Sequence, residues 1–384
     1  METLCPVFMG ERIWGDSVKN VCHLTTAHDW NDTRIFKKEC ISLSNSQLAV
    51  HLVAPGDIQM VQDGVHIHGV NFPSHNRLLR MMLMSWLVTK AAVNTKSDIY
   101  HFHDPELLPC ALLLKGLGKK VIYDVHEDVP RQILSKSWIY KPMRKIVSRV
   151  FEMFEEWASR KFDAIIPATP TIADRFNKIN NRVVCVNNYA ILEDIPTDID
   201  ESCEKGIYVC YTGAISDIRG IRQMIEAIEH TSAKLLLAGA FSCPDLYKEV
   251  TATPGWDKVI YLGEITRDEV KEVMRRSVTG LVLYHPEPNH IYSQPTKMYE
   301  YMSMRIPLVV SDFSSWRKMA DKYNCGICVN PFDICGIASA IQSYIDNPGI
   351  ARDMGLNGRR AIEADFNWDN EEKKLLLVYE EILK

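Results

Sequence analysis

The sequence predicts an α/β fold of two domains, each a parallel sheet covered by helices. Its 384 residues exceed what one hydrophobic core usually organises and suit two domains. Short apolar runs, typical of buried strands, alternate along the chain with amphipathic segments of helical period. An acidic stretch that contains proline, Ile195–Lys205, interrupts this alternation near the middle. We interpret it as the linker between the domains.

Composition excludes several classes of protein. Hydrophobic residues make up 46% and charged residues 24% of the chain, as is ordinary for a soluble globular protein. A net charge of −5 lacks the basic footprint of a nucleic-acid binder, so we expect no nucleic-acid partner. Eleven cysteines in no regular framework favour a reducing compartment. Cys325 and Cys328 have zinc-like spacing without a second ligand pair, so we expect no metal. With no signal peptide and no apolar run of about 18–20 residues, we expect a cytoplasmic protein.

The first predicted strand, Asn20–Thr26, leads into a polar loop with candidate binding residues. This loop contains His28, Asp32 and Arg34, and a helix is expected from about Ile35. Asp32 would equally serve as the N-cap of that helix.

Several later strands of this half end in histidine or acidic residues. Polar groups at the carboxyl ends of parallel strands form the binding sites of α/β folds. His101 and His103 alternate within one run, so one of them is expected to be buried and satisfied, whereas His126 follows the next run directly. The predicted strands are Leu48–Ala54, Gly64–Val70, Asp98–Asp104, Lys120–Val125, Phe162–Ala168 and Arg182–Asn187.

Two segments suggest contact with a membrane surface. Asn76–Val93 has one apolar face with basic flanks; packing on the sheet is the default interpretation, and a membrane-surface helix is the sharper hypothesis. Arg131–Arg149 contains six basic residues and no acidic ones, with Trp138 and Tyr140 interleaved. Each Lys or Arg beside anionic lipid contributes about 1 kcal/mol, although charge runs are usually solvated helix faces.

The second half opens with a predicted strand, Gly206–Thr212, and a turn that suits phosphate. Gly213 permits a tight turn, and the helix that follows offers N–H groups to an anion. Arg219 in this turn adds a cation that can bond phosphate in a fork. The other predicted elements are strands Ala233–Ala240 and Val259–Glu264 and helices Ile334–Ile345, Ile350–Ala364 and a last one ending at Leu383.

The stretch Tyr284–Asp312 is the part that is most specific for function. It follows one apolar run and ends with another, so we predict strand, loop, helix and strand. Pro295 suits the first turn of that helix. Lys297 and Glu300 are three residues apart and share one face near the helix N-terminus. A cation for phosphate and a carboxylate for paired hydroxyls together suit a nucleotide sugar.

The segment Pro295–Met302, followed by Ile306–Asp312, resembles the donor-binding signature of retaining glycosyltransferases of family 4. That family has the GT-B fold, in which two Rossmann-like domains face each other across a cleft. The resemblance extends from about Cys22 to the C-terminus. It implies an acceptor domain at 1–190, a nucleotide-sugar domain at 191–365 and, at 366–384, a helix that packs back on the first domain.

The resemblance assigns donor contacts to the predicted helix. Glu300 corresponds to the glutamate that binds the ribose hydroxyls, and Thr296 and Lys297 belong to the same donor site. The family often carries a second glutamate eight residues before the first, and this chain has Tyr292 there.

Other family positions are only partly matched. The cations that usually hold the diphosphate correspond to Arg219 and Ala214, so one is missing. His126 corresponds to a histidine that touches the donor sugar. The resemblance thus implies that the catalytic residues are His126, Arg219, Lys297 and Glu300, and that the acceptor side of the cleft contains His28, Asp32, Arg34 and His103.

The implied reaction is a metal-independent, front-face transfer in which the leaving phosphate takes the acceptor proton. The expected donor is a UDP-sugar, an N-acetylhexosamine or hexose, with no other cofactor. The expected acceptor is a polyprenyl-diphosphate-linked saccharide of O-antigen, capsule or exopolysaccharide biosynthesis, reached peripherally on the cytoplasmic face of the inner membrane. Alternatives are a nucleotide-sugar epimerase of the same fold and a non-catalytic scaffold, the latter motivated by Tyr292 and Ala214.

Overall fold

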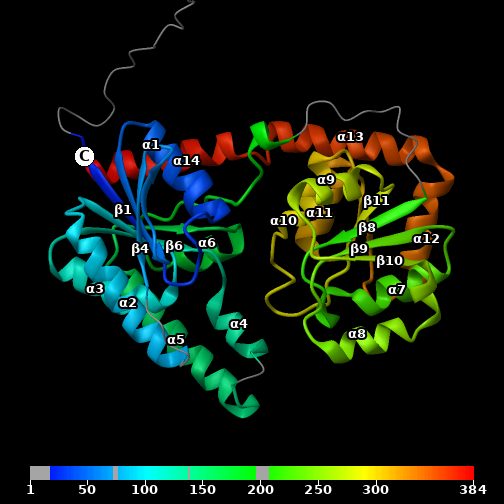
Figure 1. Ribbon diagram of the computed structural model, residues 1–384, viewed down its shortest axis with the longest axis horizontal. Coiled ribbons are helices and arrows are strands. Elements are labelled where there is room, and N and C mark those ends of the chain that lie inside the picture. Colours follow the sequence, from blue (N-terminus) through cyan, green and yellow to red (C-terminus); the bar gives the residue numbers. More distant parts are fainter. Residues whose placement is uncertain (1–17, 72–76, 137–138, 196–206) are drawn as a thin grey trace, which may run out of the picture. The chain divides into compact units, whose positions relative to one another are not determined.

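The computed structural model describes residues 18–71, 77–136, 139–195 and 207–384, which belong to two compact α/β units (Figure 1). The first unit ends at Asn187 and also includes Glu371–Lys384, and the second is Asn188–Asn370. Each contains a sheet of mainly parallel strands, which confirms the predicted fold class. Almost all of the predicted linker, and Trp138, lie outside the described residues.

The first unit is built on a seven-stranded sheet of order β3-β4-β2-β1-β5-β6-β7, antiparallel only between β3 and β4. Its strands are β1 (Asn20–Leu24), β2 (Ala49–Pro55), β3 (Gln59–Gln62), β4 (Val65–Val70), β5 (Ile99–Phe102), β6 (Lys120–Val125) and β7 (Ala164–Pro167). Its helices are the π-helix η1 (Thr33–Cys40), α1 (Ile41–Asn45), α2 (Arg77–Asn94), η2 (Pro105–Leu107), α3 (Leu108–Gly116), α4 (Val129–Ser135), η3 (Lys141–Met143), α5 (Arg144–Ser159) and α6 (Pro170–Phe176).

The two faces of this sheet differ in chemistry. Because side chains alternate along a strand, Leu24, Phe102 and Tyr123 face one way, into an apolar core shared with α2, α3 and α5. His23 and His101 face the other way, where they contact residues of η1 and of the last helix, α14 (Trp368–Leu383). That second face holds a buried polar cluster.

One predicted strand of this unit is wrong. Residues 182–187 run beside β7 and share backbone hydrogen bonds with it, but they form only an isolated bridge between Val183 and Ile165. The segment lies at the sheet edge, and the N–H of Asn187 donates to the carboxylate of Glu371 instead of to a strand.

The second unit has a six-stranded parallel sheet of order β10-β9-β8-β11-β12-β13, with an apolar core on each face. Its strands are β8 (Tyr208–Thr212), β9 (Lys234–Ala238), β10 (Val259–Gly263), β11 (Thr279–Val282), β12 (Leu308–Ser311) and β13 (Gly326–Val329). Its helices are η4 (Leu192–Asp194), η5 (Asp217–Arg219), α7 (Ile221–Glu229), α8 (Pro244–Thr251), η6 (Pro254–Lys258), α9 (Arg267–Arg275), α10 (Thr296–Ser303), α11 (Ser314–Tyr323), α12 (Ile334–Asp346) and α13 (Pro348–Ala364). In the part of the chain that the structure describes, no helix has the length and apolarity that crossing a bilayer requires.

Candidate functional site

Lys297 is the centre of a cationic group in the second unit. It lies in the first turn of α10 and is only 7% exposed. Its Nζ lies 4.1 Å from the ring centroid of Tyr211 and 5.6 Å from that of Tyr284. Among the described residues this buried Nζ has no hydrogen-bond partner. Since buried donors are nearly always paired, this Nζ atom is a candidate contact for an anionic ligand.

The surroundings of Lys297 shift the pKa of its amino group. Burial, and to a smaller extent the charge of Arg219, lower its pKa to about 7, whereas Glu300 acts in the opposite direction. A bound phosphate would favour the protonated form.

The turn after β8 forms a wall beside this ammonium group. Gly213 has a φ of +116°, and a Cβ at this position would lie 3.0 Å from Lys297 Nζ. Gly220, with a φ of +79°, is the N-cap of α7, and a Cβ there would lie 2.0 Å from the carbonyl oxygen of Leu283. The two glycines therefore leave space beside Lys297 and keep the turn close to the sheet.

Arg219 adds a second cation. Its guanidinium carbon lies 5.6 Å from the ring centroid of Tyr284, the same ring that Lys297 approaches. Its Nη1 donates to the carbonyl oxygen of Ala214 at 3.0 Å. The Ala214 side chain supplies no charge, but its backbone carbonyl accepts a hydrogen bond from the guanidinium of Arg219.

The other predicted donor residues lie at the surface of this unit. Thr296 and Glu300 are exposed, and Tyr292 is 58% exposed. Lys297 and Glu300 therefore lie on one helix in different environments. The exposed carboxylate suits a hydroxyl-bearing ligand, whereas the buried ammonium suits phosphate.

A second group of predicted residues lies in the first unit. The Nδ1 atom of His28 lies 3.2 Å from an oxygen of Asp104, which also accepts hydrogen bonds from Thr25 and Thr26. The hydrogen bond with Asp104 raises the pKa of His28 and outweighs burial, which lowers it. The His28 ring stacks on that of His126 at 5.3 Å between centroids.

His126 is a neutral hydrogen-bonding group. Its pKa is lowered to about 4, chiefly by burial; Arg34 and His28 also lower this pKa, and Asp124 acts in the opposite direction. Its Nε2 atom lies 3.0 Å from Nδ1 of His103. As a neutral imidazole, His126 suits a sugar hydroxyl better than a phosphate.

Three residues predicted for the acceptor side have other surroundings. Arg34 is buried, with Nη2 3.0 Å from an oxygen of Asp124 and Nη1 donating to the carbonyl of Val186. Asp32 caps η1 by accepting the N–H groups of Arg34 and Ile35, as the alternative interpretation of this residue expected. His103 is buried, and so is His101, although only one of the two was expected to be. Arg34 and Asp32 therefore have structural partners within the first unit, and their role toward an acceptor stays a prediction.

Sequence reasoning missed several members of the first group. Asp104 and Asp124 hold His28 and Arg34, and Glu39 and Tyr379 complete the buried cluster. A signal existed for Asp124, because a carboxylate inside the apolar run of β6 has to be paired. No local pattern marks Tyr379, which lies far along the chain.

Comparison with known proteins assigns both halves of the chain. The model of Glycosyltransferase Family 4 matches residues 40–189, and the model of Glycosyl transferases group 1 matches residues 197–361. Together they cover most of the chain.

Individual proteins that resemble this chain have low sequence identity to it. Glycogen synthase of Mycobacterium tuberculosis is 20% identical over 284 residues, 71% of this chain and 66% of that protein. The lipopolysaccharide core biosynthesis mannosyltransferase LpcC of Rhizobium leguminosarum is 25% identical over 252 residues, 60% of this chain and 68% of its own. The crystal structure of Anabaena HepE in complex with UDP superposes with a TM-score of 0.70 at 12% identity, covering 95% of this chain and 100% of that one. At that identity the likeness shows the fold.

Proposed function

Because this chain belongs to the family 4 glycosyltransferases and has the GT-B fold, we propose that it transfers a sugar from a UDP-sugar to a polyprenyl-diphosphate-linked saccharide, with retention at the anomeric carbon. That it is a glycosyltransferase that uses a nucleotide sugar follows from the family. The choice of UDP is supported by HepE, which was solved with UDP. A lipid-linked acceptor is in keeping with LpcC, a mannosyltransferase of lipopolysaccharide core biosynthesis, whereas the polyprenyl diphosphate carrier is part of our proposal alone.

The observation that carries the proposal is the buried Lys297 ammonium with no hydrogen-bond partner among the described residues, close to Arg219 and to the N-terminus of α10. When the bond from sugar to diphosphate breaks, negative charge grows on the leaving phosphate. Preorganised donors aimed at such developing charge usually contribute the largest catalytic effect. Two cations and a helix N-terminus provide them here.

The proposed reaction balances without a protein nucleophile. The bond between the anomeric carbon and the diphosphate oxygen breaks, and its electron pair leaves with UDP. The acceptor hydroxyl forms the new bond on the same face, and its proton passes to the departing phosphate oxygen. We propose that Glu300 binds the ribose hydroxyls and that this transfer step is metal-independent.

A lipid-linked acceptor requires access to a bilayer, and α5 has a suitable face. Exposed apolar side chains recur along it at intervals of three and four residues: Ile146, Val150, Met153 and Trp157, with Met143 just before its first residue; each is between 45% and 62% exposed. Lys145 and Arg149 flank this stripe and are exposed as well. An apolar stripe with basic flanks matches the chemistry of an anionic lipid surface. We propose that α5 contacts the cytoplasmic face of the inner membrane.

Transfer assays test the proposal. Labelled UDP-sugars are incubated with lipid-linked saccharides extracted from bacterial membranes, and product configuration is read by NMR. We expect an α-glycoside from an α-linked donor, and at least a 100-fold lower rate for Lys297→Met. Lys234→Met is a matched control, because Lys234 is exposed at the opposite, N-terminal end of its strand.

Two other outcomes would replace the proposal. Conversion of the UDP-sugar to its epimer without any acceptor would identify an epimerase. Tight UDP binding with no turnover of any donor would favour a scaffold.

A further inference from the structure

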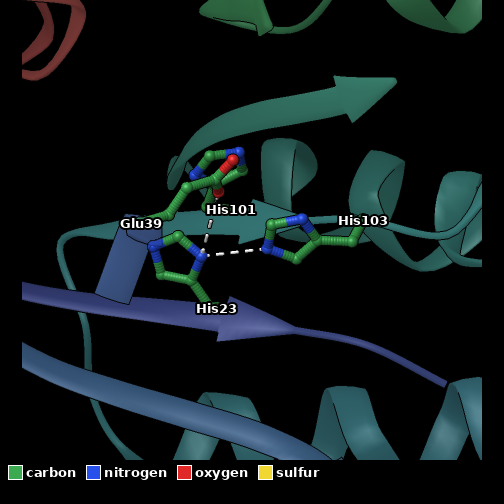
Figure 2. A group of neighbouring side chains, drawn as sticks. All are labelled: His23, Glu39, His101 and His103. Atoms are coloured by element: carbon green, nitrogen blue, oxygen red, sulfur yellow. Dashed lines mark hydrogen bonds and ion pairs between the residues drawn. The ribbon is translucent and has the colours of Figure 1, made fainter. Parts of the chain in front are cut away.

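The polar face of the first sheet contains a compact cluster of metal-ligating side chains. Figure 2 shows three histidines and a glutamate pointing toward one another: His23 on β1, Glu39 on η1, His101 on β5 and His103 directly after β5. All four side chains are buried, and one potential ligand atom from each lies within 4.8 Å of every other. The predicted donor site in the second unit uses none of them.

The separations suit a small ion. Nδ1 of His23 lies 2.9 Å from Nε2 of His103 and 3.9 Å from Oε2 of Glu39. Ligands placed tetrahedrally at 2.0–2.1 Å from Zn²⁺ are roughly 3.3 Å apart. The two observed distances lie on either side of that value, so small side-chain shifts would admit an ion.

Atoms without hydrogen-bond partners point to the same place. Among the described residues, both oxygens of Glu39 and Nε2 of His101 are buried and accept or donate no hydrogen bond. Glu39 has an ion pair with Arg34, 3.1 Å from Oε1 to Nε, and His101 Nε2 lies 3.6 Å from an oxygen of Asp124. Ion pairing alone leaves the bonding capacity of these atoms unused, which is costly in a buried site.

The opposite nitrogen of each histidine is already held. His23 Nε2 and His101 Nδ1 lie 3.2 Å and 2.7 Å from the hydroxyl of Tyr379, and His103 Nδ1 lies 3.0 Å from His126. Metal-binding histidines almost always bond a partner through their other nitrogen, which fixes the tautomer and the ring orientation. All three rings have this arrangement. Of the remaining nitrogens, that of His101 has no hydrogen-bond partner among the described residues, and those of His23 and His103 hydrogen-bond only each other, a contact that an ion between them would replace.

We propose that His23, Glu39, His101 and His103 bind one divalent transition-metal ion, and that Zn²⁺ fits this set of three nitrogens and one oxygen best. The ligands would be Nδ1 of His23, Nε2 of His101 and His103, and one carboxylate oxygen of Glu39. The ion is structural, because its ligands are fully enclosed, and it ties β1, β5 and η1 together. Through Tyr379 it also fixes α14.

A neighbouring group is a weaker candidate. His103, Asp124 and His126 also lie close enough to share an ion. Both oxygens of Asp124 already accept hydrogen bonds from Arg34, at 3.0 Å and 3.1 Å. In the first group, Glu39 and His101 offer ligand atoms that have no hydrogen-bond partner among the described residues.

The test uses the full chain. Wild type, Glu39→Gln, His101→Gln and the control His66→Gln are stripped with chelator, reconstituted with Zn²⁺ or Co²⁺, and passed through a desalting column. His66 is an exposed histidine on β4 of the same sheet, so its loss should leave the cluster intact. Metal content is measured by mass spectrometry, and the Co²⁺ protein is examined by visible absorption.

We expect one equivalent per chain and intense tetrahedral Co²⁺ bands in wild type and His66→Gln. We expect at least a tenfold weaker affinity in Glu39→Gln and His101→Gln, and a Tm of wild type roughly 5 °C higher with Zn²⁺ than with chelator. Wild type that retains no ion after reconstitution overturns the proposal, as does full occupancy in both variants. The wild-type Co²⁺ spectrum decides the question even if the variants fail to fold.

Discussion

At Lys297, burial opposes the charge that a phosphate contact requires. The ammonium lies against two tyrosine rings, and its pKa is lowered to about 7. A lysine with an ordinary pKa would bind phosphate without changing its proton occupancy. This one should change its occupancy when a diphosphate arrives.

We predict that UDP binding at pH 8 takes up close to one proton. Above pH 7 the free Lys297 is mostly neutral, and a bound diphosphate raises its pKa, so the proton comes from the buffer. For the same reason, UDP affinity should fall as pH rises through 7. Calorimetry in buffers of different ionisation enthalpy measures the uptake. Lys297→Met should abolish it, and Lys234→Met should not; an equal uptake in Lys297→Met would place the titrating group elsewhere.

Asp124 and Arg34 form a buried ion pair in the first unit. We predict that Asp124→Asn lowers the free energy of unfolding by about 3 kcal/mol, because the Arg34 guanidinium then loses the carboxylate that accepts its hydrogen bonds and keeps only Glu39 as a buried counter-charge. Glu381→Gln is the control, since it removes an exposed partner from the Arg182 pair of the same unit and should cost less than about 1 kcal/mol. Urea unfolding followed by circular dichroism measures the free energy of unfolding of both variants. Equal decreases in the two variants would show that the buried pair contributes no more to stability than the exposed pair.

At the scale of single elements, α5 offers a different reason for membrane contact than the basic composition of its sequence. The basic run Arg131–Arg149 suggested lipid contact, but Arg144 donates to the carbonyls of Ile139 and Leu134 and Arg131 pairs with Glu152. These cations serve the fold. The exposed apolar stripe, which the charge count did not reveal, is the better reason to propose a membrane surface.

We predict that the double substitution Val150→Asp with Met153→Asp reduces binding to vesicles of anionic phospholipid at least tenfold. Each change removes apolar area from the stripe and adds a negative charge that the lipid repels. Leu377→Asp on α14 is the control, since it is equally exposed outside the stripe. Cosedimentation measures the fraction of protein that is bound to the vesicles. An equal loss of vesicle binding in the double variant and in Leu377→Asp would show that the stripe on α5 is not the membrane-binding surface.

At the scale of the whole molecule, the sequence predicted the architecture well and the polar interior poorly. Apolar runs and turn glycines are local signals, so both sheets and the Gly213 turn could be predicted. The role of Arg34 could not, because its partner Asp124 is ninety residues away and comes close only through the sheet register. Tyr379 reaches His101 across still more of the chain. Such pairings depend on topology and leave no periodic trace in the sequence.

The central claim is that the second unit binds UDP through α10 and the turn after β8. The most direct measurement is calorimetric titration of UDP, GDP and ADP into wild type and Glu300→Ala, without added metal. We predict that UDP binds at least tenfold more tightly than the other two nucleotides. We also predict that Glu300→Ala weakens UDP binding 10- to 100-fold while leaving folding unchanged, because the lost carboxylate accepts hydrogen bonds from ribose hydroxyls. No UDP binding, or equal affinity in Glu300→Ala, would contradict the account.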